Sequence, residues 1–464
     1  MIYQQVGEVQ KGMAGILKIA GEQVEINDGT GLRERAVDDL IHTAVFSDDE
    51  AMRTAARWLI RRAGAAAGVL SASIQPLYEA MGRGEAKGFT VPAINIRALT
   101  YHTAQAVLRA AMKLDVGPVI FEIARSEIDY TRQRPTEYIA AVTAAALKVG
   151  YRGPLFLQGD HFQINAGKYA QNSEREVKAV KDLIWEAIEA GFYNIDVDTS
   201  TLVDLTQKTV KDQQRINYTL AAELTAMIRD LEPAGITVSV GGEIGEVGGK
   251  NSTVEELAAF MAGYREELKK IDPAMKGISK ISVQTGTTHG GVPMPDGTVA
   301  KVKLDFATLE QLSREARATY GLAGAVQHGA STLPPEAFDR FPAVGTAEVH
   351  LATGFQNIVY ESPHLPADLK SRVYDHLRQT YRGEKKEGET EEQFLYKTRK
   401  KGFGPFKKDF WDLPPATLAA LGKELENQFS FLFTKLNMAG TKVLLDKYVP
   451  PVDVPLQAPR DLVA

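Results

Sequence analysis

The sequence predicts an α/β fold, a (β/α)8 TIM barrel with an N-terminal extension and a C-terminal helical addition. From about residue 89 the chain alternates short β-rich runs with longer helical patterns, and eight such runs occur. Eight strands separated by helices favour a closed barrel over an open doubly wound sheet. At 464 residues the chain is long for one domain but suits a large barrel with additions.

The elements follow in order along the chain. Residues 1–70 form the predicted extension, with a hairpin around 16–21 and two amphipathic helices that end in an Ala-rich run at 61–69. The barrel is expected over residues 71–382. Its eight strands are predicted at 89–96, 116–124, 154–158, 194–198, 236–242, 280–285, 324–327 and 347–353.

Two helices between these strands carry clear starting signals. Residues 173–190 open with Ser-Glu-Arg-Glu and repeat apolar residues every three or four positions, which predicts an amphipathic helix. Residues 253–269 open with Thr-Val-Glu-Glu-Leu in the same way. Residues 383–464 are predicted to be a charged segment (383–412) and a helical region with a long helix at about 415–438. Such a charge run usually forms a solvated face, and contact with a substrate phosphate is the less favoured alternative.

Composition excludes several functions. A net charge of -5 and a pI near 6.0 give no sign of nucleic-acid binding. The chain has no cysteine, which excludes disulfides and thiolate sites. No signal peptide is evident, and no apolar run approaches the ~20 residues that span a membrane. We therefore expect a soluble, cytoplasmic protein without a nucleic-acid or membrane partner.

Three of the eight histidines each end an apolar, strand-like run. His161 closes the run Leu-Phe-Leu-Gln-Gly-Asp-His. His289 is followed by a Gly-Gly turn, and His328 is followed by a Gly-Ala-Ser turn. The carboxyl ends of barrel strands face the active site. Imidazoles from three strands can converge there on one metal ion and leave a position open for substrate. The alternative is that each is an ordinary core or loop histidine.

Acidic residues accompany these histidines. Asp160 directly precedes His161 and could exchange a proton with a substrate hydroxyl, although it could instead cap the next helix. Glu243 lies among glycines that let the backbone turn sharply, and with Glu246 it could bind a metal or orient a ligand histidine. The glycine turns after His289 and His328 expose N–H groups that can hold phosphate.

In this order, Asp160-His161, Glu243-Ile-Gly-Glu-Val-Gly-Gly, His289-Gly and His328-Gly-Ala-Ser resemble the class II, metal-dependent ketose-bisphosphate aldolases over roughly residues 91–353. The resemblance implies one catalytic Zn²⁺ held by His161, His289 and His328, and it allows a second divalent ion. The resemblance also implies that Asp160 is the acid–base group for the C4 hydroxyl and that Glu243 and Asp196 are additional metal-site acids. The positions that match the ketose C1 phosphate site are Gly290, Gly329, Ser331 and Thr353. His350 would face the enediolate where the family usually has asparagine, and the alternative is a buried histidine bonded to a neighbouring strand end.

The activity implied is reversible cleavage of fructose 1,6-bisphosphate to dihydroxyacetone phosphate and glyceraldehyde 3-phosphate, as in glycolysis and gluconeogenesis, by a homo-oligomer. Zn²⁺ would stabilise the enediolate as a Lewis acid. A Schiff-base mechanism would need a desolvated lysine at a strand end, and the sequence shows no clear one. The Ala352-Thr353 pair is closer to tagatose-type members, so tagatose 1,6-bisphosphate is an alternative substrate. A non-catalytic accessory subunit is the alternative of a different class.

Overall fold

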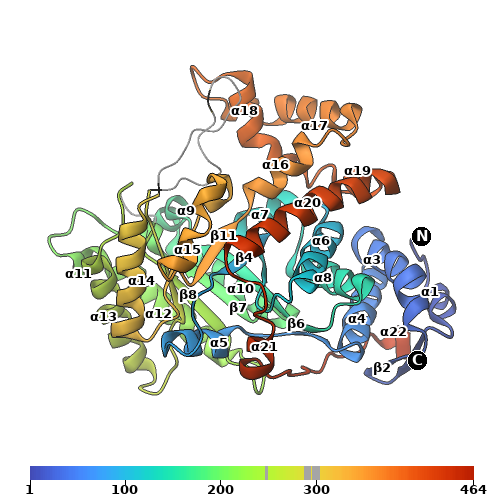
Figure 1. The fold of residues 1–464 in the computed structure, drawn as a ribbon, viewed down its shortest axis with the longest axis horizontal. Coiled ribbons are helices and arrows are strands. Elements are labelled where there is room, and N and C mark those ends of the chain that lie inside the picture. Colours follow the sequence, from blue (N-terminus) through green and yellow to red (C-terminus); the bar gives the residue numbers. More distant parts are fainter. Residues whose placement is uncertain (246–248, 287–293, 295–303, 464) are drawn as a thin grey trace.

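Eight parallel strands close into a ring in the computed structural model, which describes residues 1–245, 249–286, 294 and 304–463 (Figure 1). Neighbouring strands are hydrogen-bonded, and both the β11–β4 and β6–β7 pairings are present, so the sheet has no open edge within the ring. The predicted (β/α)8 barrel is therefore confirmed. Its strands are β4 (Val91–Asn95), β5 (Ile120–Ala124), β6 (Gly153–Gln163), β7 (Asn194–Asp198), β8 (Ser239–Glu243), β9 (Lys280–Val283), β10 (Ala325–Gln327) and β11 (Glu348–Leu351).

Helices surround the ring and begin where the sequence predicts capping. In α13 (Val254–Ile271), the Thr253 hydroxyl accepts from the Glu256 backbone N–H at 3.1 Å, and the Glu256 carboxylate accepts from the Thr253 N–H at 2.8 Å. In α10 (Ser173–Ala190), the bounds match the prediction, but Asn172 supplies the cap. The other outer helices include α6 (Thr100–Lys113), α7 (Arg125–Thr131), α8 (Pro135–Val149), α12 (Arg215–Asp230), α14 (Phe306–Tyr320) and α16 (Thr353–Glu361).

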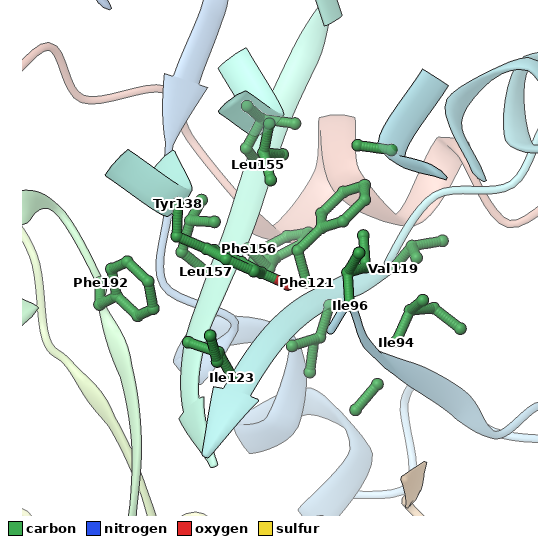
Figure 2. Close-up of a cluster of buried hydrophobic side chains, with 14 of the residues drawn as sticks. Ile94, Ile96, Val119, Phe121, Ile123, Tyr138, Leu155, Phe156, Leu157 and Phe192 are labelled. Atoms are coloured by element: carbon green, nitrogen blue, oxygen red, sulfur yellow. The ribbon is translucent and has the colours of Figure 1, made fainter. Parts of the chain in front are cut away.

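The outward faces of the strands form the hydrophobic core with these helices. Because side chains alternate along a strand, Phe121 and Ile123 of β5 share one face, as do Leu155 and Leu157 of β6, and this face points away from the barrel axis. Tyr138 of α8 packs against Phe192 with ring centroids 6.0 Å apart, and its hydroxyl donates to the Glu122 carbonyl at 2.7 Å. Figure 2 shows this cluster, which includes Ile94, Ile96, Phe121, Ile123, Leu155 and Leu157.

The inner face of the ring is polar. Lys280 of β9 is 1% exposed, and its ammonium contacts Glu348 at 2.5 Å, Gln158 at 2.8 Å and Asp196 at 3.0 Å. Burial alone would lower the pKa of Lys280, but the two carboxylates raise it, so the amine is protonated at neutral pH. Glu348 also accepts from the hydroxyl of the buried Tyr78. A charged network therefore fills the centre of the barrel.

We expect this charged network to contribute to the free energy of unfolding. Glu348→Ala should lower the free energy of unfolding by about 3–5 kcal/mol, because it leaves the Lys280 ammonium without its nearest counter-charge in a site closed to water. Glu310→Ala, an exposed position on α14, is the matched control and should stay within about 0.5 kcal/mol of wild type. Denaturant unfolding of both variants measures the difference. Equal stability of the two would contradict a charged barrel interior.

The N-terminal residues pack on the outside of the barrel. The predicted hairpin is present as β1 (Leu17–Ala20) and β2 (Gln23–Ile26), and α3 (Val37–Phe46) and α4 (Glu50–Ala66) follow. Helix α4 lies against α8, and β3 (Val69–Ser71) pairs with β6. Strand β3 spans the predicted boundary at residue 70, and the domain division itself stays a prediction.

The C-terminal residues also lie against the barrel. The long helix predicted at about 415–438 is α20 (Pro415–Lys435), which packs on α6. Before it come α17 (Ala367–Thr380), α18 (Glu391–Thr398), η6 (Arg399–Gly402) and α19 (Lys407–Trp411), which lie to one end of the ring (Figure 1). In the described part of the chain, none of the helices has the length and apolarity that a membrane span requires.

Candidate active site

A cavity of about 390 Å³ opens at the carboxyl ends of the barrel strands. It is bounded by the ends of β4, β5, β6, β10 and β11 and by Lys400 of η6. Among the predicted site residues, the cavity is lined by Asp160, His161, His328, Gly329, Ser331, His350 and Thr353. The predicted strand-end side chains thus lie around one cavity, as expected, and their roles stay predictions.

Asp160 and His161 both reach the cavity because β6 is irregular. The strand continues to Gln163, five residues beyond its predicted end, and its pairing with β7 shifts between Gly159 and Phe162. At this bulge His161 has φ of +40°, a left-handed conformation that side chains rarely adopt. A Cβ at Gly159 would lie 2.4 Å from the Phe162 ring, so glycine is needed for the bulge to pack. The strained backbone turns His161 toward the same side as Asp160.

Two of the predicted metal-ligand histidines meet directly. His161 Nε2 lies 3.0 Å from His328 Nδ1, and the ring centroids are 4.1 Å apart. Together with Asp160 they offer three ligand atoms within reach of one ion. Nitrogen and carboxylate donors of this kind suit Zn²⁺. The third predicted ligand, His289, lies outside the described residues, as do Gly290 and Glu246.

Each of these histidines is also held by an oxygen at its other nitrogen. His161 Nδ1 lies 3.1 Å from Asp198 Oδ2, and His328 Nε2 lies 3.0 Å from the Ser282 hydroxyl and 3.4 Å from Glu243 Oε2. Such contacts orient metal-ligating histidines in proteins. Glu243 thus lies beside the outer nitrogen of His328, and both roles that the sequence left open for it stay predictions.

Asp198 is a residue of the candidate site that the sequence analysis did not single out. The acid it named on the same strand, Asp196, points deeper into the barrel, where its carboxylate faces Lys280 at 3.0 Å and His350 at 3.8 Å. Asp198 stands two residues later, on the same face and nearer the mouth. Its carboxylate also accepts from the Ser200 hydroxyl at 2.8 Å. The signal available in the sequence was that Asp198 is the last residue of the strand.

His350 sits between carboxylates. Its Nδ1 lies 3.0 Å from Glu122 Oε2 and 3.2 Å from Asp160 Oδ1, and its Nε2 lies 2.6 Å from Glu348 Oε1. Burial alone would lower the pKa of His350, but Glu122 and Asp160 raise it well above the usual value. Burial and the Asp160 charge raise the pKa of Glu122 to about 8. The imidazole of His350 thus lies against the carboxylate of Asp160.

A buried lysine is present, although the sequence showed no clear candidate. Lys280 is desolvated, but it stands at the first residue of β9 rather than at its carboxyl end, and it does not line the cavity. A Schiff base needs a neutral amine. Because Asp196 and Glu348 keep the Lys280 amine protonated, Lys280 is unsuited to that chemistry.

Three of the predicted phosphate-binding positions, Gly329, Ser331 and Thr353, line the cavity together. Gly329 has φ of +67°, which lets the chain turn directly after His328 into the short helix of Ala330–Thr332. A Cβ at Gly354 would lie 2.8 Å from the Ser331 carbonyl, so this turn packs closely on the start of α16. The Thr353 hydroxyl accepts from Arg97 Nη1 at 3.2 Å. Arg97, which the sequence analysis did not single out, brings a cation beside Thr353.

Fold and site together define a β/α-barrel protein whose mouth carries paired histidines and acids, a donor set that fits a divalent metal. Residues 75–400 match the family model described as "Fructose-bisphosphate aldolase class-II". The match covers more than half of the chain, so the chain belongs to the class II fructose-bisphosphate aldolase family.

Individual relatives are distant. A fructose-bisphosphate aldolase of Thermus caldophilus is 24% identical over 300 residues, which cover 64% of this chain and 78% of that protein. Among solved structures, a probable tagatose 6 phosphate kinase from Sinorhizobium meliloti 1021 has a TM-score of 0.54 at 19% identity, over 81% of this chain and 96% of that one. The fructuronate-tagaturonate epimerase UxaE from Cohnella laeviribosi has a TM-score of 0.56 at 13% identity, over 91% and 93%. These two likenesses concern the fold.

Proposed function

We propose that this protein is a zinc-dependent aldolase that reversibly cleaves fructose 1,6-bisphosphate to dihydroxyacetone phosphate and glyceraldehyde 3-phosphate. The observation that carries the proposal is the 3.0 Å approach of His161 Nε2 to His328 Nδ1, beside Asp160 and at the mouth of the barrel. Family membership supports the reaction class, and the donor set supports the metal.

In this proposal His161 and His328 hold the ion, with His289 as the third ligand. Asp198 and Glu243 keep the two described rings oriented through their outer nitrogens. When bound, the ion supplies Lewis-acid polarisation of the substrate's carbonyl oxygen.

Asp160 is the acid–base group. As the C3–C4 bond of the ketose breaks, its carboxylate accepts the proton of the C4 hydroxyl, and the C4 carbon leaves as an aldehyde. In the reverse direction it returns that proton. His350 positions the carboxylate through its contact with Asp160 Oδ1 at 3.2 Å. A role of His350 at the enediolate, as the sequence predicts, is compatible with its place in the cavity wall.

His350 provides a test of this positioning. His350→Ala should lower turnover by about 10- to 100-fold with metal content unchanged, because the imidazole that lies 3.2 Å from Asp160 Oδ1 no longer positions that carboxylate. His350→Asn should retain much more activity, since the amide can still donate one hydrogen bond. Steady-state cleavage assays and metal analysis measure both effects. Equal turnover of the alanine variant and wild type would show that His350 does not contribute to catalysis.

Two measurements distinguish the proposed function from its alternatives, which are cleavage of tagatose 1,6-bisphosphate and a non-catalytic accessory subunit. Cleavage rates with fructose 1,6-bisphosphate and tagatose 1,6-bisphosphate, each on the metal-loaded protein, decide the epimer. Absence of cleavage with either substrate, in protein that holds about one ion per chain, would favour an accessory subunit. A cytoplasmic location, a homo-oligomeric state and a place in glycolysis and gluconeogenesis belong to the same proposal.

A further inference from the structure

The charged segment predicted as a solvated face sends one turn into the active-site cavity. This turn, residues 399–404, is attached to the barrel at several points. The Tyr360 hydroxyl donates to the Arg399 carbonyl at 2.8 Å, and Arg399 pairs with Glu361 at 2.8 Å. A Cβ at Gly404 would lie 2.1 Å from the Tyr130 carbonyl, so the turn lies directly on α7. The turn is therefore held firmly against the cavity.

Lys400 of this turn lines the cavity without a carboxylate partner. Among the residues that the structure describes, no acid lies within ion-pair distance of its ammonium, which stands 5.7 Å from the centre of the Tyr130 ring. Its neighbour Lys401 differs: that ammonium contacts Glu384 at 2.6 Å and does not line the cavity. Partial burial and the positive charge of Arg97 lower the pKa of Lys400. Lys400 and Arg97 are two of the four Lys and Arg side chains that line this cavity, together with Lys168 and with Arg125, which is paired with Glu176.

Arg97 is the second of these cations. Its guanidinium pairs with Glu127 at 2.7 Å and donates to Thr353 at 3.2 Å and to Gln356 at 3.1 Å. These contacts fix the guanidinium at the start of α16, on the side of the cavity that carries Ser331 and Thr353. Unpaired positive charge beside a fixed guanidinium and hydroxyl groups suits an anion with several acceptor oxygens.

We propose that Lys400, supplied by the C-terminal addition, and Arg97, at the end of the first barrel strand, form the cationic half of a phosphate subsite over Thr353. With the proposed function as its basis, this subsite receives the C1 phosphate of the ketose bisphosphate. The C-terminal addition is then part of the substrate site rather than an outer layer. Lys400 acts by binding and sets specificity for a phosphorylated C1.

The test compares three variants in the metal-loaded, full-length protein. Lys400→Ala should weaken the binding of inorganic phosphate, measured by calorimetry, by at least about fivefold, and should raise KM for fructose 1,6-bisphosphate by at least about tenfold with metal content unchanged. Lys400→Arg should stay within about twofold of wild type, because it keeps the charge. Lys401→Ala is the matched control: it removes the same charge from the same turn and should change neither value.

The outcomes separate the subsite from the aldolase activity. Lys400-dependent phosphate binding in a protein that cleaves no ketose bisphosphate supports the subsite and counts against the proposed function. Cleavage of fructose 1,6-bisphosphate with equal phosphate affinity and KM in Lys400→Ala overturns the subsite and leaves the function standing. Acetate is the carboxylate probe, and acetate binding with the same dependence on Lys400 also overturns a phosphate subsite. Parallel losses in Lys401→Ala would reveal a structural effect and overturn the specific role of Lys400.

Discussion

His161→Ala is expected to strip the catalytic metal and to lower cleavage of fructose 1,6-bisphosphate by at least about 10³-fold, since Lewis-acid stabilisation contributes several kcal/mol and ~1.4 kcal/mol corresponds to tenfold. The effect is large because His161 Nε2 and His328 Nδ1 face one another at 3.0 Å, so neither donor is dispensable. Metal analysis of the purified variant, with a steady-state assay, measures both losses.

Two further variants separate ligand loss from misfolding. His161 has a left-handed backbone that asparagine tolerates well, so His161→Asn should fold without added strain yet still lose metal and activity. His364→Ala changes an exposed histidine beside Glu424, away from the cavity, and should match wild type in both measurements. A His161→Asn protein that holds one ion per chain and cleaves at the wild-type rate would refute the proposed metal site.

Asp160→Asn is expected to reduce turnover by about 10²–10⁴-fold, the usual contribution of an acid–base group, while the metal stays bound. An amide has nearly the shape of the carboxylate but cannot accept the proton of the C4 hydroxyl. The folded structure should persist, because the amide has nearly the volume of the carboxylate and keeps an oxygen that can face His350 Nδ1. Turnover, metal content and thermal unfolding of the variant are the three readouts.

Asp182→Asn is the matched control for this substitution. Asp182 lies exposed on α10 in an ion pair with Lys178, and its loss should leave turnover unchanged. If Asp160→Asn slows cleavage by less than about threefold, the residue belongs only to the polar interior of the barrel, and another group performs the proton transfer.

The strands of the barrel were predictable because their signals are local. Strand β7 has the predicted bounds, 194–198, since an apolar run and its alternation lie within a few neighbouring residues. Strand β6 was predicted to end five residues too early, because the bulge at His161 breaks the alternation on which the prediction depends. The same bulge is what brings two successive residues to one cavity.

The candidate site was predictable only in part. The strand-end positions of Asp160, His161 and His328 follow from the barrel, because all its strands run parallel and end at one mouth. Depth within the barrel does not follow from spacing, so the sequence singled out Asp196 and passed over Asp198 on the same face. The partners of Lys280 were likewise hidden, since Glu348 lies 68 residues away along the chain.

The sequence by itself determined the α/β class, the eight-strand order and the histidines and acids at the barrel mouth, because periodicity, capping and strand ends are properties of short segments. Only the tertiary structure decided which charges meet. Closure of the ring places Lys280 between Asp196 and Glu348, and the return of the C-terminal segment places Lys400 in the wall of the cavity that Arg97 also lines. Such contacts join residues that are far apart in the chain, and side-chain charge alone does not reveal whether a lysine faces solvent or a cavity.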